Sequence, residues 1–262
     1  MCELLAVAGS APVDVRLSLS TLAGHGGLDG HPDGWGVAFA DGNDTHVWRD
    51  PHAAAQNPWI DCLAHHPIRS ELVIAHIRRA TRGAMTLANT QPFVRELWGR
   101  TQTFAHNGDL DFHPRLDGTT SRRFCPIGET DSETAFCDFL DDVARTDGRT
   151  DAIQACFIDA ATRLRRIGPA NILYASGGRL WAHADRRKQK SGAIEPPGLW
   201  LLERSCEADS DGLDTSALSV RSSARKVVVL ASVPLTNEPW RPLPRGTVLA
   251  IAGGTVVEMD VP

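Results

Sequence analysis

Two consecutive amphipathic helices, with runs of short strands before and after them, constrain the fold of this chain more than any other sequence feature. The first helix begins after Thr130, which has capping-box spacing with Glu133, and keeps an apolar face through Val143. The second covers Asp151 to Ile167 and ends at a Gly-Pro pair. This order predicts an α+β protein with antiparallel sheets and with the helices on their outer faces.

The strands are expected where apolar and β-branched residues gather between turns rich in Gly, Asn and Asp. These segments are Glu3 to Ala8, Gly34 to Ala40, Thr45 to Arg49, Glu71 to Arg78, Thr101 to Ala105, Asn171 to Ala175, Arg179 to His183, Leu199 to Leu202, Lys226 to Ser232, and a Thr247 to Met259 hairpin. We also expect short helices at Val13 to Ala23 and Pro58 to His66, and a glycine-rich loop from Gly24 to Gly34.

Two polar segments are interpreted as surface excursions, Asp185 to Gly198 and Glu203 to Ala224. The basic run Arg186-Arg187-Lys188 is interpreted as a solvated face. No repeat or linker stands out in the 262 residues, and we expect residues 1–262 to form a single domain.

Composition excludes several classes of function. A net charge of -5 gives no electrostatic attraction to nucleic acid or anionic lipid. No apolar run approaches the ~18 residues of a membrane span, and no leader is recognised, so a cytoplasmic protein is expected. The 6 cysteines contain no Cys-x-x-Cys and the 10 histidines no pair at metal-binding helical spacing, so neither a disulfide framework, a metal nor a cofactor is predicted.

Chemically active residues gather where a strand ends or a helix begins: Cys2, Arg78 with Thr81, Asn107-Gly108, and Asp131. Cys2 follows the initiator methionine, and removal of that residue would leave a thiol and a free α-amino group on one residue. The amine has a reference pKa of about 7.7–8.0 and can therefore accept the thiol proton near neutral pH.

The other groups suit an amide in a small zwitterion. Asn107 Nδ2 and the Gly108 N–H can stabilise an oxyanion. Arg78 can bind a carboxylate and Asp131 an ammonium group, which points to L-glutamine as the substrate.

Each group also has an alternative interpretation. The Met-Cys start can be an accident, Arg78 a structural ion-pair partner, Asn107-Gly108 an ordinary tight turn, and Asp131 a residue favoured by the helix dipole. Their joint occurrence in one chain favours the catalytic interpretation.

Ordered motifs strengthen it, and they lie in about the first half of the chain. They are Met1-Cys2, His76-Ile77-Arg78-Arg79-Ala80-Thr81-Arg82-Gly83, Asn89-Thr90-Gln91-Pro92-Phe93, His106-Asn107-Gly108 and Thr130-Asp131-Ser132-Glu133. In these motifs the chain resembles the class II glutamine amidotransferases, which are N-terminal nucleophile hydrolases. The Met-Cys-Glu-Leu-Leu start, the Asp33-Gly34-Trp35-Gly36 segment, Glu96 to Arg100 and the chain length are most similar to the stand-alone YafJ-type subgroup.

The resemblance implies a four-layer αββα sandwich of two mainly antiparallel sheets. It also implies Cys2 as nucleophile, Asn107 and Gly108 as the oxyanion hole, Arg78 and Asp131 as the clamp on glutamine, and Thr81 in the glutamine-binding loop. The chain departs from the family at Gln91, where histidine is usual, and at Arg82, where several synthases carry histidine.

The hypothesis is a glutaminase-type amidotransferase that forms a γ-glutamyl thioester, releases ammonia and then glutamate. Family synthases carry a second domain that uses the ammonia, and we expect none here, so a separate ammonia-accepting protein is a possible partner. One alternative is an amidohydrolase that cleaves a larger γ-glutamyl compound, with a wider pocket at the Gly24 to Gly34 loop. Another is a binding module that senses glutamine without using its thiol.

Overall fold

The computed structural model describes residues 2–17, 33–54, 57–59, 62, 68–79, 83–111, 123–205, 213–214, 218–221 and 226–260. The expected loop at Gly24 to Gly34 lies outside this part except for its last two residues. Of the expected helix at Pro58 to His66, only three residues are described, and all three are helical.

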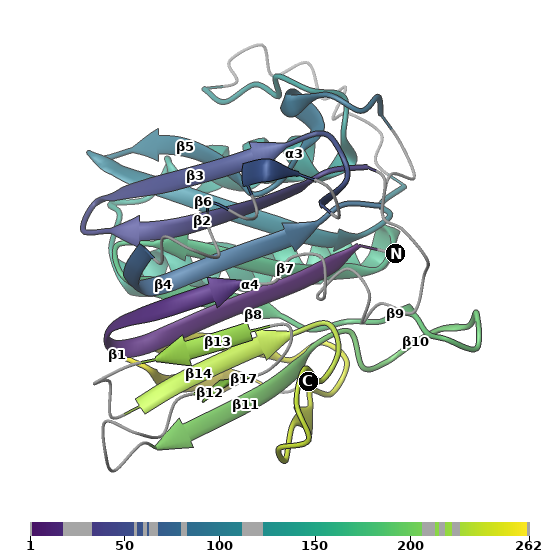
Figure 1. The fold of residues 1–262 in the computed structure, drawn as a ribbon. Helices are drawn as coiled ribbons and strands as arrows, with labels where there is room; N and C mark the ends of the chain where they lie inside the picture. Colours follow the sequence, from purple (N-terminus) through teal and green to yellow (C-terminus); the bar gives the residue numbers. More distant parts are fainter. Residues whose placement is uncertain are drawn as a thin grey trace.

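Most of the described strands form two sheets whose neighbouring strands are antiparallel (Figure 1). Sheet A has the order β15-β11-β14-β1-β4-β2-β3, with β13 beside β1 and β12 beside β13; sheet B has the order β17-β16-β8-β7-β6-β5. The bounds in sheet A are β1 Glu3–Leu17, β2 Trp35–Asp41, β3 Asp44–Asp50, β4 Ile68–Ile77, β11 Trp200–Ser205, β12 Leu213–Asp214, β13 Leu218–Arg221, β14 Lys226–Ala231 and β15 Arg241–Pro242. Those in sheet B are β5 Phe93–Leu97, β6 Arg100–Gly108, β7 Ala170–Ser176, β8 Arg179–His183, β16 Val248–Ala252 and β17 Thr255–Asp260.

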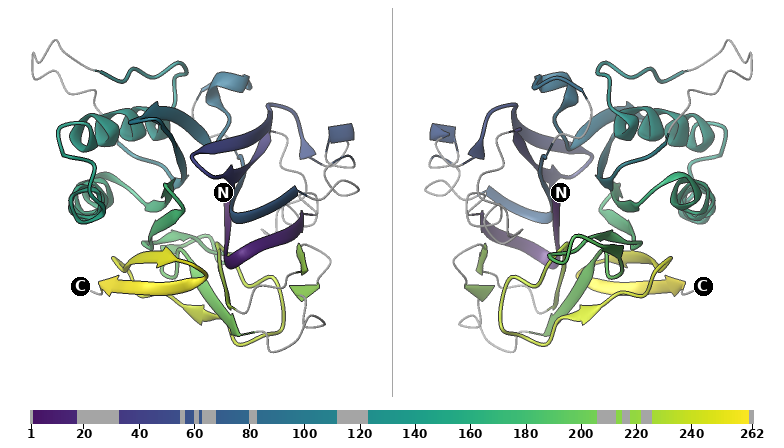
Figure 2. Two further views of the ribbon diagram at one scale, coloured as in Figure 1. Left: turned by 90° about the vertical axis from the view of Figure 1, so that its left-hand side faces the viewer. Right: turned by 90° about the vertical axis from the view of Figure 1, so that its right-hand side faces the viewer.

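The helices follow β6 in the chain and cover sheet B. Helix α3 spans Asp131–Val143 and α4 spans Thr150–Ile167, with a 3-10 turn, η2, at Leu87–Asn89 and a small hairpin of β9 Arg187–Lys188 and β10 Ile194–Glu195 elsewhere. Figure 2 shows α3 and α4, coloured teal, on one side of the molecule, away from the N-terminal strands of sheet A.

Side chains alternate between the two faces of each strand, and this alternation builds the layers. In β1, Leu4 and Ala6 face a cluster between the sheets, whereas Leu5 and Val7 face a cluster on the outer face of sheet A. A third cluster joins the outer face of sheet B, through residues such as Tyr174, to α3 and α4. Three apolar interfaces require four layers, which confirms the predicted α+β sandwich of two mainly antiparallel sheets.

In the described part of the chain, the outermost layer over sheet A is built from loop segments and short helical pieces. Ala54, Leu235 and Trp240 are buried in the cluster there, and the rings of Trp48 and Trp59 meet edge to face with centroids 5.6 Å apart. Loop segments therefore contribute to this layer.

The expected helix at Val13 to Ala23 is wrong over its described part, because residues 13–17 form the second half of β1. Val-Asp-Val-Arg-Leu alternates apolar and polar residues with a period of two, which suits a strand. Its backbone pairs with β4 through Val13 and Ser70, and with β13 through Leu17 and Leu218. Residues 13–17 form a strand and not a helix because β4 and β13 offer backbone partners on both of their edges.

The two surface excursions are also partly wrong. The segment after β8 carries the buried side chains of Asp185 and Arg187, and the second excursion contains the end of β11 as well as β12 and β13. Strands β11, β12 and β13 belong to sheet A, whereas Arg187 of β9 lies behind Cys2.

Candidate active site

The antiparallel topology brings distant segments to one edge of the sandwich. β1 begins where β4 ends, with Glu3 opposite Ile77, so that Cys2 lies beside Arg78 and Arg79. In sheet B, β6 ends at the same edge. The strand ends in His106-Asn107-Gly108 as expected, since residues 106–108 belong to β6, and the tight-turn alternative for Asn107-Gly108 is wrong because Asn107 pairs with Asn171 of β7.

Cys2 is held against the backbone of Arg79. The Arg79 N–H donates to Sγ at 3.1 Å, and the thiol donates to the Arg79 carbonyl oxygen at 3.3 Å. Burial raises the pKa of the Cys2 thiol, and the neighbouring Glu3 carboxyl also raises this pKa, whereas the Arg79 N–H, the chain's amino terminus and Arg78 lower it. The thiol is therefore protonated at neutral pH.

Asn107 links the two sheets at Cys2. Its Nδ2 donates to the Cys2 carbonyl oxygen at 2.6 Å and to Ser232 Oγ at 3.3 Å. Its Oδ1 is buried and accepts no hydrogen bond from the residues that the structure describes. The carboxamide thus presents a donor toward Cys2 and keeps one acceptor available.

Glycine is the only residue type that fits at position 108. A Cβ atom there would lie 1.7 Å from the Pro169 carbonyl oxygen and 2.5 Å from His106 Nε2. The close approach of β6 to Pro169 therefore requires glycine.

Arg78 is buried, and backbone carbonyl groups fix its guanidinium. Nη1 donates to the Asp33 oxygen at 3.3 Å and Nη2 to the Gly83 oxygen at 3.1 Å. Its charge reaches Cys2, because it lowers the pKa of that thiol. Thr81 lies outside the described residues.

Asp131 occupies the first turn of α3, as predicted, and Thr130 accepts the expected capping hydrogen bond from the Glu133 N–H. Asp131 Oδ2 accepts from the Leu110 N–H at 2.7 Å, which ties the carboxylate to the chain just beyond Gly108. Asp131 also acts on His106, whose pKa is lowered by burial and raised by this carboxylate. The half-buried Asp131 is thus oriented from both β6 and α3.

The side chain of Gln91 supplies the hydrogen bonds that a neighbouring strand would otherwise give to His106 near the end of β6. The chain turns away from β6 at a cis Gln91-Pro92 bond, just before β5. The Gln91 side chain then accepts from the His106 N–H at 2.6 Å and donates to the His106 carbonyl oxygen at 3.2 Å. Its carboxamide satisfies both backbone groups of the residue preceding Asn107.

Sequence reasoning missed a buried ion pair behind Cys2. Arg187 Nη2 lies 2.5 Å from Glu3 Oε1, and the two side chains are 6% and 1% exposed. Burial raises the pKa of Glu3 to about 7, although Arg187 opposes this rise. A glutamate inside the apolar strand after Cys2 was the available signal, and the solvated-face interpretation of Arg187 is wrong.

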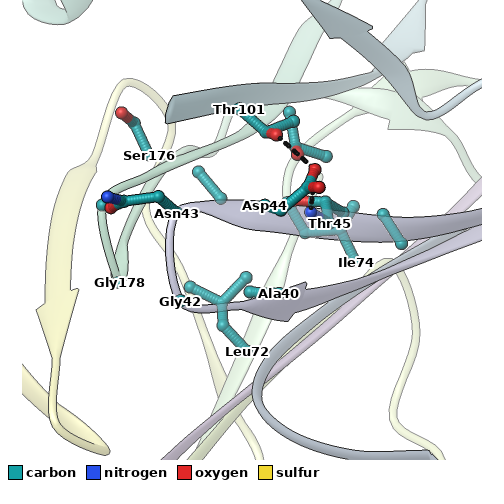
Figure 3. A pocket seen from close by; sticks show the side chains of 14 residues that line it. Ala40, Gly42, Asn43, Asp44, Thr45, Leu72, Ile74, Thr101, Ser176 and Gly178 are labelled. Carbon is teal, nitrogen blue, oxygen red and sulfur yellow. Dashed lines mark hydrogen bonds between the residues drawn. The ribbon is translucent and has the colours of Figure 1, made fainter. Parts of the chain in front are cut away.

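A small, shallow hollow lies at the opposite end of the sandwich (Figure 3). It opens at the β2–β3 turn and is lined by residues including Thr101, Thr103 and Ser176. Asp44 is its only ionisable lining residue, and its Oδ1 already accepts from Thr101 Oγ1 at 3.1 Å and from the Thr45 N–H at 2.8 Å. We therefore place the candidate site at Cys2 and not in this hollow.

Within the described ranges, no three His, Cys, Asp or Glu side chains are grouped so that they could hold a metal ion. The described helices include none that is both long and apolar enough to span a membrane.

Comparison with known proteins places this geometry in a family. The family model of class-II glutamine amidotransferases matches residues 1–262. The Escherichia coli K12 protein named "Putative glutamine amidotransferase YafJ" is 37% identical over 254 residues, which cover 94% of this chain and 95% of the relative. A Haemophilus influenzae protein named "Putative glutamine amidotransferase" is 34% identical over 251 residues, covering 94% of this chain and 82% of the relative.

Solved structures agree. The crystal structure titled as a predicted glutamine amidotransferase from Pseudomonas aeruginosa PA01 has a TM-score of 0.74 and 32% identity, covering 98% of this chain and 100% of that one. The glutamine phosphoribosylpyrophosphate amidotransferase of Bacillus subtilis has a TM-score of 0.61 at 16% identity, covering 99% of this chain and 49% of that one. The latter similarity shows the fold alone.

The contacts of Gln91 predict a stability effect. Gln91→Leu keeps similar volume but leaves the His106 N–H and carbonyl without partners, and we expect a loss of about 1–3 kcal/mol in the free energy of unfolding. Urea denaturation measures this loss. Gln189→Leu is the matched control, because it removes two side-chain hydrogen bonds, to the carbonyl oxygens of Glu195 and Pro197, on a surface hairpin. It should lower the free energy of unfolding by less than about 0.5 kcal/mol. Equal stabilities of the two variants would contradict the assignment.

Proposed function

The chain belongs to the class II glutamine amidotransferases, and on this premise we propose that it hydrolyses the γ-carboxamide of L-glutamine with Cys2 as the nucleophile. The observation that carries the proposal is the 2.6 Å contact from Asn107 Nδ2 to the Cys2 carbonyl oxygen, which places next to Cys2 an N–H that would turn from this carbonyl to the oxyanion as it forms. An oxyanion-hole donor of this kind is worth about 2.7–4 kcal/mol in the transition state.

The mechanism begins with removal of Met1. Because burial raises the pKa of the thiol, Cys2 does not attack as a free thiolate. The new α-amine takes the thiol proton as Sγ bonds to the amide carbon, and the carbonyl oxygen becomes an oxyanion.

Collapse of the tetrahedral intermediate completes the first half-reaction. Asn107 Nδ2 and the Gly108 N–H stabilise the oxyanion, and the protonated amine gives its proton to the leaving nitrogen, which departs as ammonia. Water, deprotonated by the amine, then attacks the γ-glutamyl thioester and releases glutamate and the thiol.

The charged ends of glutamine select the substrate. Arg78 binds the α-carboxylate and Asp131 the α-ammonium group, with Thr81 in the adjoining loop. The fixed guanidinium of Arg78 and the carboxylate of Asp131, held by the Leu110 N–H, support these roles.

We also propose that residues 1–262 act as one domain, and that the ammonia passes to a separate partner protein or to solvent. Pairing of β1 with β14, whose residues are 226–231, joins the first strand to a late segment of the chain in one sheet and supports the first point. A nucleophilic thiol must remain reduced, which fits a cytoplasmic location.

The nucleophile assignment predicts a loss of chemistry with retained binding. Cys2→Ala should release no ammonia from glutamine yet still bind it, because Arg78 and Asp131 remain. After treatment with diazo-oxo-norleucine, the intact mass of the wild type should show loss of Met1 and one covalent adduct. The variant should show no adduct. Cys156→Ala, which changes a half-buried cysteine of α4, is the control and should behave as the wild type. Active protein that retains Met1 would defeat the mechanism.

The role of Asp131 predicts a change in selectivity. Wild type should prefer glutamine over glutaramate, which lacks the α-amino group, by roughly 10- to 100-fold in kcat/KM, because a hydrogen bond to a charged group is worth about 1.5–3 kcal/mol. Asp131→Asn should abolish most of this preference by acting on glutamine alone. A variant that loses activity equally on both compounds would argue that Asp131 supports the fold instead.

The alternative of a larger γ-glutamyl substrate is decided by turnover. We expect ammonia release from glutamine to exceed cleavage of γ-glutamyl peptides when the two rates are measured on one preparation. Rapid peptide cleavage beside negligible glutamine turnover would replace glutaminase with γ-glutamyl amidohydrolase, with the same nucleophile.

A further inference from the structure

A contribution to folding stability does not explain why the buried Glu3–Arg187 ion pair is present. Desolvation of two charges offsets most of their attraction, and apolar replacement of such a pair is often neutral or stabilising. The pair nevertheless lies directly behind Cys2, with both side chains at most 6% exposed. Its contacts with other groups are therefore more informative than its contribution to stability.

Ser232, just after β14, connects this pair to Asn107. Arg187 Nη1 donates to the Ser232 carbonyl oxygen at 3.0 Å, and the Ser232 N–H donates to the Leu4 oxygen at 3.0 Å. The Ser232 hydroxyl oxygen accepts from the Leu4 N–H at 2.9 Å and from Asn107 Nδ2 at 3.3 Å. Ser232 is thus fixed by β1 and Arg187 and touches the carboxamide next to the nucleophile.

The direction of these hydrogen bonds is determined. Ser232 Oγ accepts two N–H groups, so its own proton must go to another acceptor. Glu3 Oε2 is buried and has no hydrogen bond within the described residues, so the pair offers an open acceptor behind Cys2. The Leu4 N–H, and the Arg187 contact to the Ser232 carbonyl oxygen, therefore hold Ser232 with its Oγ toward Asn107.

We propose that Ser232, held by the Glu3–Arg187 ion pair, is a positioning residue that fixes which side of the Asn107 carboxamide faces Cys2. A carboxamide turned by 180° would place Oδ1 against the Cys2 carbonyl oxygen and would repel an oxyanion. Two acceptors, the Cys2 oxygen and Ser232 Oγ, exclude that orientation. The inference rests on the proposed function, in which Asn107 stabilises the oxyanion.

Ser232→Ala removes one acceptor and leaves the apolar packing in place. We expect kcat for glutamine, expressed per active site titrated with diazo-oxo-norleucine, to fall roughly tenfold to hundredfold, the effect of a misplaced catalytic group. KM should change by less than about twofold, because Arg78 and Asp131 are untouched. Ser232→Thr restores the hydroxyl and should recover most of the lost kcat.

Two further variants separate positioning from general stability. The double variant Glu3→Gln/Arg187→Met removes the pair without leaving a single buried charge, and should lower kcat to a similar extent. Ser176→Ala changes another serine, 5% exposed, at the opposite end of the sandwich, and should keep wild-type kcat and KM. Wild-type kcat per titrated site in Ser232→Ala would overturn the inference, even if its melting temperature falls.

The inference can fail separately from the proposed function. If the wild type releases no ammonia from glutamine, the proposed function fails, and the side-chain amide protons of Asn107, assigned by their loss in Asn107→Asp, still report its orientation by NMR. We expect slow solvent exchange of these protons in the wild type and exchange at least tenfold faster in Ser232→Ala. Equal exchange rates would show that Ser232 does not position Asn107.

Discussion

The hydrogen bond from Asn107 Nδ2 to the Cys2 carbonyl is the contact on which the site depends, because its two residues belong to different sheets. Cys2 precedes the first strand of sheet A, whereas Asn107 lies in a strand of sheet B. Only face-to-face packing of the sheets at the correct offset can bring the two groups within 2.6 Å. The core between the sheets therefore determines the geometry of the candidate site.

Several close backbone approaches set this offset. Gly36 of β2 faces the Gln91 carbonyl, where a Cβ would lie 2.3 Å from the oxygen, and the Arg49 guanidinium donates to the Thr90 oxygen at 2.9 Å. Sheet A is thus anchored to the cis Gln91-Pro92 turn, and the Gln91 side chain is anchored to His106. The chain of contacts passes from β2 to β6 and ends beside Asn107. The apolar core alone does not fix how the two sheets are offset. These polar contacts therefore set the offset of sheet A relative to sheet B.

The sequence allowed prediction of elements whose signals are local. The α3 helix could be predicted from its Thr130 cap and apolar periodicity, and the β2–β3, β7–β8 and β16–β17 hairpins from their turns. Elements decided by distant partners could not be predicted. Residues 13–17 fit either a helix or a strand until β4 and β13 supply edges, and Arg187 is polar in sequence but is buried by a glutamate 184 positions away. The motifs indicated Cys2, Arg78, Asn107 and Asp131, whereas Ser232 carries no local signal at all.

The electrostatics behind Cys2 bear on how the proposed reaction moves its proton. Burial raises the thiol pKa, and the Glu3 carboxylate raises it further, which is the opposite of what an enzyme that stores a thiolate requires. The same carboxylate favours a positive charge nearby, and the proposed mechanism creates one when the α-amine takes the thiol proton. Glu3 would therefore disfavour the thiolate in the resting enzyme and stabilise the ammonium group as the carbon–sulfur bond forms. A neutral thiol that loses its proton only during attack is consistent with both effects, and it keeps the buried site free of an unpaired anion before substrate binds.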